Sequence, residues 1–162
     1  MKDIMCKNKF LIFNTEEKIL IFLKQQNKKT NYFVPTIYTE GNNIDNPISF
    51  KILEILNLNF ENVQLVNEFH DEYFSFKIID DELTRKKVIR EKKYYAVYHK
   101  FTQEEYNEIY TICLSQNIIS YMVSLEELEY IMNLKRKRVA DMDLYIGHTA
   151  KMLQKKLKYE EY

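Results

Sequence analysis

The apolar and polar positions at the start of the chain predict a strand followed by a helix. Residues 9–13 form a short apolar segment that is typical of a buried strand. Asn14 and Glu17 have the spacing of a helix capping box, in which two side chains satisfy backbone N–H groups of the first turn. The apolar run Ile19–Leu23 follows directly, and we therefore expect a helix over residues 15–27.

The next segment predicts a strand and then a second helix. Residues 31–38 are rich in β-branched and aromatic side chains, which favour strands. Pro35 indicates a sheet edge, because proline cannot donate a hydrogen bond to a neighbouring strand. Asn46 followed by Pro47 is a typical helix start, and apolar residues recur at helical spacing after it.

In the middle of the chain the apolar period changes to two residues, which indicates strands. We expect one strand around residues 63–65 and another over 73–79, joined by a turn at 67–72. Residues 80–93 are charged and weakly periodic, so they predict a long loop or a protruding hairpin arm. The aromatic segment 94–99 predicts another strand.

The last third of the chain has clear local signals. Thr102 and Glu105 form a capping box that predicts a helix, and residues 118–123 predict a strand. A further capping box precedes an apolar repeat at every seventh position, which predicts a long helix over 125–158. Gly147 costs a helix about 1 kcal/mol relative to alanine, so we expect a break near it.

Together these segments predict an α+β fold, with a mixed sheet of about 5–7 strands and about four helices. The chain has 162 residues, which is enough to bury a core without metal or disulfide support. We expect a single domain over residues 1–162, with the long C-terminal helix packed on it or extending from it.

The composition limits the chemistry that the chain can carry. Its formal net charge is zero, so no overall field favours nucleic acid or an anionic membrane. The two glycines stand at positions 41 and 147, which excludes the glycine-rich loops that cradle phosphates and cofactors. The three histidines lack the spacing of a zinc site, and neither cysteine resembles an activated nucleophile. We therefore expect no cofactor, no metal and no catalytic residue.

The candidate binding surface combines tyrosines with arginines and lysines. Tyrosine and arginine are common at protein interfaces, and several tyrosines directly follow the charged segment. A second basic run occurs in the predicted C-terminal helix. The candidate binding residues are Arg85, Lys86, Lys87, Arg90, Lys92, Lys93, Tyr94, Tyr95, Tyr98, Lys135, Arg136 and Arg138.

These features favour a small non-enzymatic binding protein that docks on another protein. The bias toward Lys, Asn, Ile, Tyr and Phe indicates an AT-rich genome, and small proteins of this kind often serve phages or mobile elements as inhibitors, counter-defence proteins or immunity factors. We expect a cytoplasmic protein with reduced cysteines, because neither a secretory signal nor a membrane-spanning run is seen. A self-complementary seam at 125–153 also allows two chains to pair.

Two other functions are consistent with the sequence. The first is nucleic-acid binding by the basic segment 85–93 together with the run 135–138. The more distant one is a metal-dependent nuclease that uses Asp81, Glu91 and Lys93, because paired carboxylates with a nearby lysine can hold and use a divalent cation.

Overall fold

The computed structural model describes residues 2–26, 29–40 and 47–134, and this part of the chain forms seven strands and three helices. In chain order the elements are β1 (Lys2–Phe13), β2 (Ile19–Gln26), β3 (Lys29–Phe33), β4 (Thr36–Glu40), α1 (Pro47–Ile55), β5 (Gln64–Ile79), β6 (Glu82–Tyr98), α2 (Gln103–Leu114), β7 (Ile118–Val123) and α3 (Leu125–Leu134).

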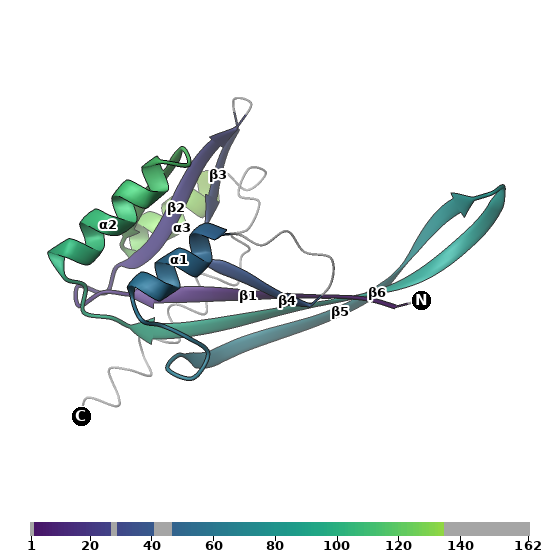
Figure 1. The fold of residues 1–162 in the computed structure, drawn as a ribbon, viewed down its shortest axis with the longest axis horizontal. Coiled ribbons are helices and arrows are strands. Elements are labelled where there is room, and N and C mark those ends of the chain that lie inside the picture. The colour runs from purple at the N-terminus through teal and green to yellow at the C-terminus, as the bar shows by residue number, and fades with distance from the viewer. Residues whose placement is uncertain (1, 27–28, 41–46, 135–162) are drawn as a thin grey trace.

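The seven strands form one mixed sheet, and helices cover both of its faces (Figure 1). The hydrogen-bonded order is β3-β2-β1-β6-β5, with β4 paired to β1 and β7 paired to β2. β1 and β6 run parallel, whereas the other pairs are antiparallel. The prediction of an α+β fold with a mixed sheet is confirmed, but the described residues hold three helices where we expected about four.

The central strands are buried on both faces of the sheet. On one face, Ile12 of β1 packs with Ile52 of α1 and Ile109 of α2. On the other face, Leu11 lies in the cluster that includes Leu128 of α3. A strand that is covered on both sides is apolar at successive positions and does not alternate with polar residues.

The predicted helix over 15–27 is wrong, because this segment forms a tight turn and then β2. The Oδ1 atom of Asn14 accepts hydrogen bonds from the N–H groups of Glu16 at 3.0 Å and Lys18 at 2.9 Å, which closes the turn. Glu17 has a φ of 62° inside it. The apolar run that follows is buried on both faces of β2, and a run of this length does not distinguish a buried strand from a buried helix.

The region around Pro35 forms two strands where the sequence predicts one. β3 ends at Phe33 and β4 begins at Thr36, so the chain leaves the sheet briefly at the proline. The backbone N–H of Thr36 donates to Ser49 Oγ of α1 at 2.9 Å, and this hydrogen bond connects the start of β4 to the helix.

The middle of the chain forms one long hairpin. The turn expected at 67–72 is absent, because β5 continues through it to Ile79. Of the two expectations for residues 80–93, the loop is wrong and the protruding hairpin arm is confirmed, since β6 begins at Glu82 and pairs with β5. Asp80 and Asp81 have φ values of 51° and 61°, and this pair of left-handed residues is typical of a two-residue type I′ hairpin turn.

The remaining local predictions agree with the structure as far as it is described. α1 begins at Pro47, and α2 follows the capping box, in which Glu105 N donates to Thr102 Oγ1 at 3.1 Å. α3 ends at Leu134 in the described part, so the rest of the expected helix 125–158 lies outside the described residues. None of the described helices has the length and hydropathy needed to span a bilayer.

Candidate functional site

The most prominent candidate site is the hairpin of β5 and β6, which projects from the domain (Figure 1). β1 supports β6 from Tyr98 as far as the pair Lys2–Lys87. Beyond that pair, residues 74–86 have no further strand beside them in the described part of the chain. We refer to residues 69–92 as the arm. At about 3.4 Å per residue, the unsupported end projects roughly 20 Å.

The register of the hairpin sorts the arm's side chains into two faces. Directly opposed residues share a face, so the odd-numbered residues of β5 lie with the even-numbered residues of β6. This positive face carries the cations Lys77, Lys86, Arg90 and Lys92 and the carboxylates Asp71 and Glu82. The opposite, apolar face carries Phe74, Phe76, Ile78 and Leu83 at its outer end, beside Arg85 and Lys87.

Two lysines and two hydroxyls are neighbours on the positive face. Ser75 is paired with Lys86, and Lys77 is paired with Thr84. The two pairs are two residues apart along each strand, which is a separation of about 7 Å. We call these four residues the lysine–hydroxyl quartet. Its side chains are hydrogen-bond donors with two positive charges, and none of the four is a carboxylate.

Two arginines of the arm contact a carboxylate or aromatic rings. Arg90 Nη2 donates to Asp71 Oδ2 at 2.6 Å, and the Arg90 guanidinium lies 4.7 Å from the centroid of the Tyr73 ring. On the apolar face, the Arg85 guanidinium lies 4.5 Å from the centroid of the Phe74 ring. Exposed ion pairs contribute little to stability, so we read these contacts as setting the directions of the side chains.

Glu72 lies in a small network on the apolar face. The hydrogen bond from His70 is the main cause of a lowered pKa of Glu72, and Lys87 lowers it further through a hydrogen bond and its charge. His70 Nε2 lies 3.1 Å from Glu72 Oε1, and Lys87 Nζ lies 3.2 Å from Glu72 Oε2. These contacts compensate the negative charge of Glu72 within the arm.

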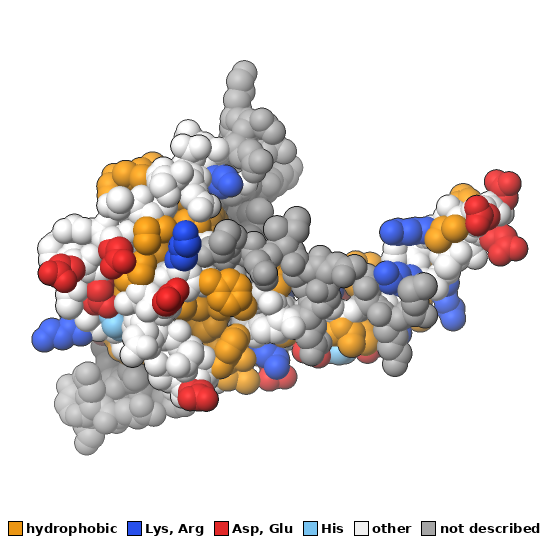
Figure 2. Space-filling model, in the orientation of Figure 1, with side chains coloured by type: hydrophobic (Ala, Val, Ile, Leu, Met, Phe, Trp, Pro, Cys, Tyr) orange, Lys and Arg blue, Asp and Glu red, His pale blue; other side chains and the backbone are white. Residues whose placement is uncertain are grey.

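Figure 2 shows how these charges are distributed on one side of the molecule. Lysine and arginine side chains are spread along the projecting arm with apolar side chains between them, and a cluster of acidic side chains lies at its tip. The tip contains Asp80, Asp81 and Glu82. A negatively charged ligand would therefore meet the sides of the arm more favourably than its tip.

The structure places the six basic candidates of the segment 85–93 on β6, but it divides them between the two faces. Arg85, Lys87 and Lys93 share the apolar face, while the others belong to the positive face. The basic run 135–138 lies outside the described residues.

The three candidate tyrosines lie in or against the core. Tyr94 is 0% exposed and packs in the cluster under α3. Tyr95 is half-buried and stacks on Phe10 with the ring centroids 5.4 Å apart, and burial raises its pKa. Tyr98 packs against Phe13 at a centroid distance of 5.6 Å. Their contribution to the structure is packing at the base of the arm.

The three residues of the nuclease hypothesis are not brought together. Asp81 lies in the turn at the tip of the arm, whereas Glu91 and Lys93 lie on β6 near its base. Ten residues of strand correspond to about 33 Å, far more than a shared cation allows. Among the described residues no group of three or more His, Cys, Asp or Glu side chains has a geometry that could hold a metal ion.

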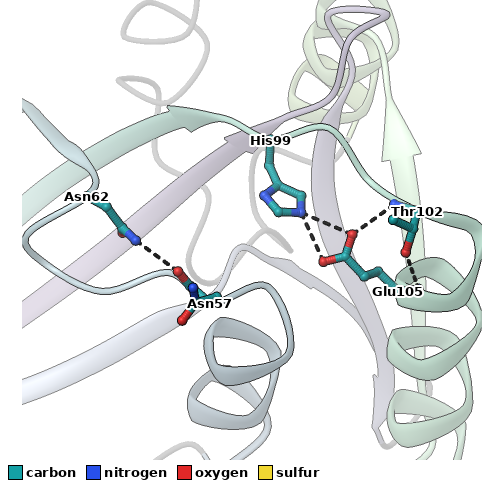
Figure 3. A network of polar contacts seen from close by, with 5 residues as sticks. All are labelled: Asn57, Asn62, His99, Thr102 and Glu105. Carbon is teal, nitrogen blue, oxygen red and sulfur yellow. Dashed lines mark hydrogen bonds and ion pairs between the residues drawn. The ribbon is translucent and has the colours of Figure 1, made fainter.

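A second polar cluster joins the end of β6 to the start of α2 (Figure 3). His99 Nε2 lies 3.2 Å from Glu105 Oε1 and 3.1 Å from Glu105 Oε2. The Thr102 backbone N–H donates to Glu105 Oε1 at 2.8 Å. His99 and Glu105 are each 19% exposed, and the ring of Phe101 packs edge-on against His99. The Glu105 carboxylate therefore accepts a hydrogen bond at the start of α2 and also contacts the His99 imidazole.

The pockets described in the structure are open and modest in size. One of about 360 Å³ is lined by residues 61–64 and 96–98, next to His99 in the sequence, but the imidazole does not line it. Figure 3 shows Asn62 near this region, where its amide donates to the Asn57 carbonyl at 2.8 Å. Another pocket of about 230 Å³ lies between α2 and β7 and includes Tyr106 and Tyr121.

Both cysteines are free and buried. Cys113 is 0% exposed in the core beside α1, and burial raises its pKa to about 11. A thiol with so high a pKa is protonated near neutral pH and is a poor nucleophile. Cys113 therefore packs as a small hydrophobic side chain in the core.

Ser75, Lys77 and Thr84 were not among the candidate site residues expected from the sequence. They alternate with apolar side chains in segments that we interpreted only as a strand and as part of a charged loop or hairpin arm. The signal that could have found them is the turn Asp80–Asp81, because it fixes which residues of the two strands are opposed.

The comparisons with known proteins give only remote structural likenesses. No family model matches the chain, and no curated protein matches it. A Caenorhabditis elegans Ap4A hydrolase is 12% identical with a TM-score of 0.36 and covers 95% of this chain and 98% of its own. A MutT protein from Methanosarcina mazei is 16% identical with a TM-score of 0.45 and covers 97% of each chain. MutT from Aliivibrio salmonicida and Vibrio cholerae is 12% identical with a TM-score of 0.34, over 78% of this chain and 85% of the other.

These matches overturn the expected class of function. The matched structures are Ap4A hydrolases and MutT proteins, whereas the sequence led us to expect a non-enzymatic inhibitor or immunity protein that docks on another protein. They contradict the expectation of a non-enzymatic inhibitor, and the likeness itself is one of fold alone. With TM-scores of 0.34 to 0.45, the matches assign neither a substrate nor a catalytic residue to this chain.

Proposed function

We propose that the arm binds the phosphate backbone of a nucleic acid through its positive face. The observation that carries this proposal is the lysine–hydroxyl quartet, Ser75, Lys77, Thr84 and Lys86, which the hairpin register places side by side. Lysine and hydroxyl side chains are common donors to phosphate oxygens, and such contacts carry no sequence preference.

The shape of the arm supports the same proposal. A projecting two-stranded ribbon can lie along a nucleic-acid backbone while the domain stays clear of it, and β-ribbons are one of the elements that bind nucleic acids. Lys77 and Thr84 are exposed, and Arg90 continues the row of cations toward the domain. The Asp71–Arg90 pair reduces the charge at the base of the arm.

The experiment compares two matched double variants in the binding of fluorescent single-stranded and duplex oligonucleotides. Lys77→Gln with Lys86→Gln removes both charges of the quartet, whereas Lys51→Gln with Lys100→Gln removes two exposed charges outside the arm. If each quartet lysine contacts one phosphate, their loss weakens binding about 100-fold at roughly 50 mM salt. The control double variant is expected to bind like the wild type. Equal affinities for all three proteins would contradict the proposal.

A second candidate function is hydrolysis with His99 as a general base. It is favoured by one observation, the half-buried contact between His99 and Glu105, because an imidazole oriented by a carboxylate is a common arrangement of catalytic bases. The nitrogen that does not face Glu105 would take a proton from the attacking water.

The test of this second candidate is a panel of nucleoside polyphosphates and phosphodiesters, assayed with and without magnesium. If His99 is the base, His99→Gln abolishes turnover, and Glu105→Gln lowers it and shifts the pH dependence of the rate. Turnover that survives His99→Gln, or its absence across the panel, would remove the hypothesis. Circular dichroism of both variants separates lost activity from lost folding.

A further inference from the structure

In the part of the chain that the structure describes, the outer edge of β5 is an open strand edge. β5 has 16 residues, and its strand partner in the described part of the chain is β6 on the inner side only. In an antiparallel pair every second residue directs its N–H and C=O groups away from the partner, so the outer side carries a row of these groups. Monomeric proteins usually blunt such edges with proline, bulges or short strands.

The outer part of this edge has none of these three protections, and its charged side chains are Asp71, Glu72 and Lys77. Residues 69–79 contain no proline and no glycine, and the irregularity in the β5–β6 register lies outside them, at Leu65 and Asn67. Phe74 is 49% exposed, Phe76 is 59% exposed and Ile78 is 76% exposed. An edge that is long, regular and apolar is suited to pairing with another strand.

We propose that a second copy of this chain pairs with the edge, β5 antiparallel to β5, about a twofold axis. Such an axis stands perpendicular to the sheet at the point where the two strands meet, so each face of the arm continues into the same face of the other copy. Directly opposed residues must therefore be both odd-numbered or both even-numbered. This condition excludes half of the possible registers.

Charge selects one register among those that remain. Lys77 is the only lysine or arginine in β5, and the strand's carboxylates are Glu68, Asp71 and Glu72. Among these carboxylates only Asp71 is odd-numbered, as Lys77 is. Only one register therefore places Lys77 opposite a carboxylate, and that carboxylate is the partner's Asp71. The twofold axis then produces this pair twice. Registers centred on Asp71 or Glu72 instead oppose identical charges, which is unfavourable.

The selected register gives favourable neighbours elsewhere along the edge. Phe74 lies opposite the partner's Phe74 at the twofold axis, which places the two rings at the centre of the interface. Each Arg90, already bonded to Asp71 at 2.6 Å, extends the new ion pair into a network of three groups. Phe76 lies opposite the partner's Glu72, whose carboxylate is held by the partner's own Lys87 and His70 contacts.

This inference does not rest on the proposed function. The second copy pairs with the backbone edge of β5, and Lys77 belongs both to the quartet and to the proposed ion pair with the partner's Asp71. In the dimer the two positive faces lie on the same side of a four-stranded ribbon. The test is therefore made in the absence of nucleic acid, and its outcome is separate from the binding experiment.

The first measurement is the mass of the full chain in solution by sedimentation equilibrium. The wild type is expected to approach twice 19.8 kDa as its concentration rises. Lys77→Asp leaves the ion pair of Asp71 with Arg90 intact but opposes like charges between copies, so the dissociation constant of the dimer should rise at least about tenfold. The double variant Lys77→Asp with Asp71→Lys exchanges the charges and should restore the dimer.

The second measurement tests the register by disulfide formation. Phe74→Cys places two thiols opposite each other at the axis, so mild oxidation should link the copies. Phe76→Cys is the matched control, because its thiol and the partner's are four residues apart along the edge, about 14 Å. The native thiols of Cys6 and Cys113 are buried and do not compete.

Two results would overturn the inference. One is a monomer at every concentration of the wild type. The other is a dimer that tolerates Lys77→Asp and links as readily through Phe76→Cys as through Phe74→Cys, since that dimer must use another surface or register. Recovery of the dimer in the charge-exchanged variant, with selective linking through Phe74→Cys, supports it.

Discussion

His99 Nε2 lies 3.1 Å from Glu105 Oε2, and this contact joins the end of β6 to the first turn of α2. Burial alone would raise the pKa of Glu105, but the hydrogen bonds from Thr102 and His99 outweigh it and hold the pKa below its usual value. The ionised carboxylate is therefore part of what stabilises the connection between the arm's inner strand and the helix.

This lowered pKa predicts how stability depends on pH. A carboxylate whose pKa is lower in the folded state stabilises the fold above its unfolded-state pKa, and this contribution is lost as the pH falls through the folded-state pKa. The free energy of unfolding of the wild type should exceed that of Glu105→Gln near pH 7, and the difference should shrink toward about pH 3. Urea unfolding at several pH values measures it.

Glu104→Gln, in the same turn, controls for the loss of one negative charge. A difference between wild type and Glu105→Gln that stays constant over the whole pH range would mean that ionisation of Glu105 does not matter.

The cap of α2 predicts the cost of removing one hydroxyl. Thr102→Ala deletes the acceptor for Glu105 N, which leaves a donor of the first turn without its side-chain partner, so we expect a loss of about 1 kcal/mol in the free energy of unfolding. Thr111→Ala is the matched control, because Thr111 Oγ1 donates only to the Asn107 carbonyl within the same helix. Thermal or urea unfolding measures the loss of stability in both variants. Equal losses would contradict the assigned cap.

The hairpin turn predicts that glycine stabilises the arm. Asp81 has a φ of 61°, where glycine has no steric cost and alanine does. Asp81→Gly should slow hydrogen exchange of the arm's backbone amides by an amount that corresponds to about 0.5–1 kcal/mol, and Asp81→Ala should accelerate it. Faster exchange in the glycine variant would show that the turn does not have this conformation.

The helix α1 predicts a contrast between two neighbouring apolar residues. Ile52 is 0% exposed in the core, whereas Phe50 is 46% exposed on the same helix. Ile52→Ala should lower the free energy of unfolding by about 2–5 kcal/mol, because it leaves a cavity. Phe50→Ala should cost well under half as much. Similar losses measured by urea unfolding would mean that α1 packs in another orientation.

The sequence predicted those elements whose ends are marked by local chemistry. The capping box of Thr102 and Glu105 located α2, and the Asn46–Pro47 start located α1, because both signals act within one turn of a helix. The mixed α+β class followed from these helices together with the alternating segments.

The wrong predictions arise where the same local signal, a capping residue or an apolar run, is compatible with both a helix and a strand. Asn14 accepts from two backbone N–H groups, as a capping residue does, but the bonds close a tight turn before a strand. The apolar run of β2 is buried on both faces, and that burial depends on β1, β7 and the helices rather than on the run itself. Tertiary packing decides such a segment.

The candidate site was only partly predictable for a related reason. The basic residues of β6 were visible as a charged run, but their division between two faces depends on the hairpin register. Without that register, Lys77 and Ser75 appear to belong to a different element from Lys86. Tyr94 shows the reverse case, since a tyrosine beside a basic segment lies fully in the core.

The slope of binding affinity against salt concentration tests the central claim most directly. Each phosphate contact contributes about 0.9 to the slope of log K against log salt on duplex DNA, so removing the two lysines of the quartet should reduce the slope by about 2. The double variant Lys77→Gln with Lys86→Gln is therefore expected to show the smaller slope, and Lys51→Gln with Lys100→Gln the slope of the wild type. A wild-type slope near zero, or the same slope in both double variants, would contradict phosphate binding by the arm.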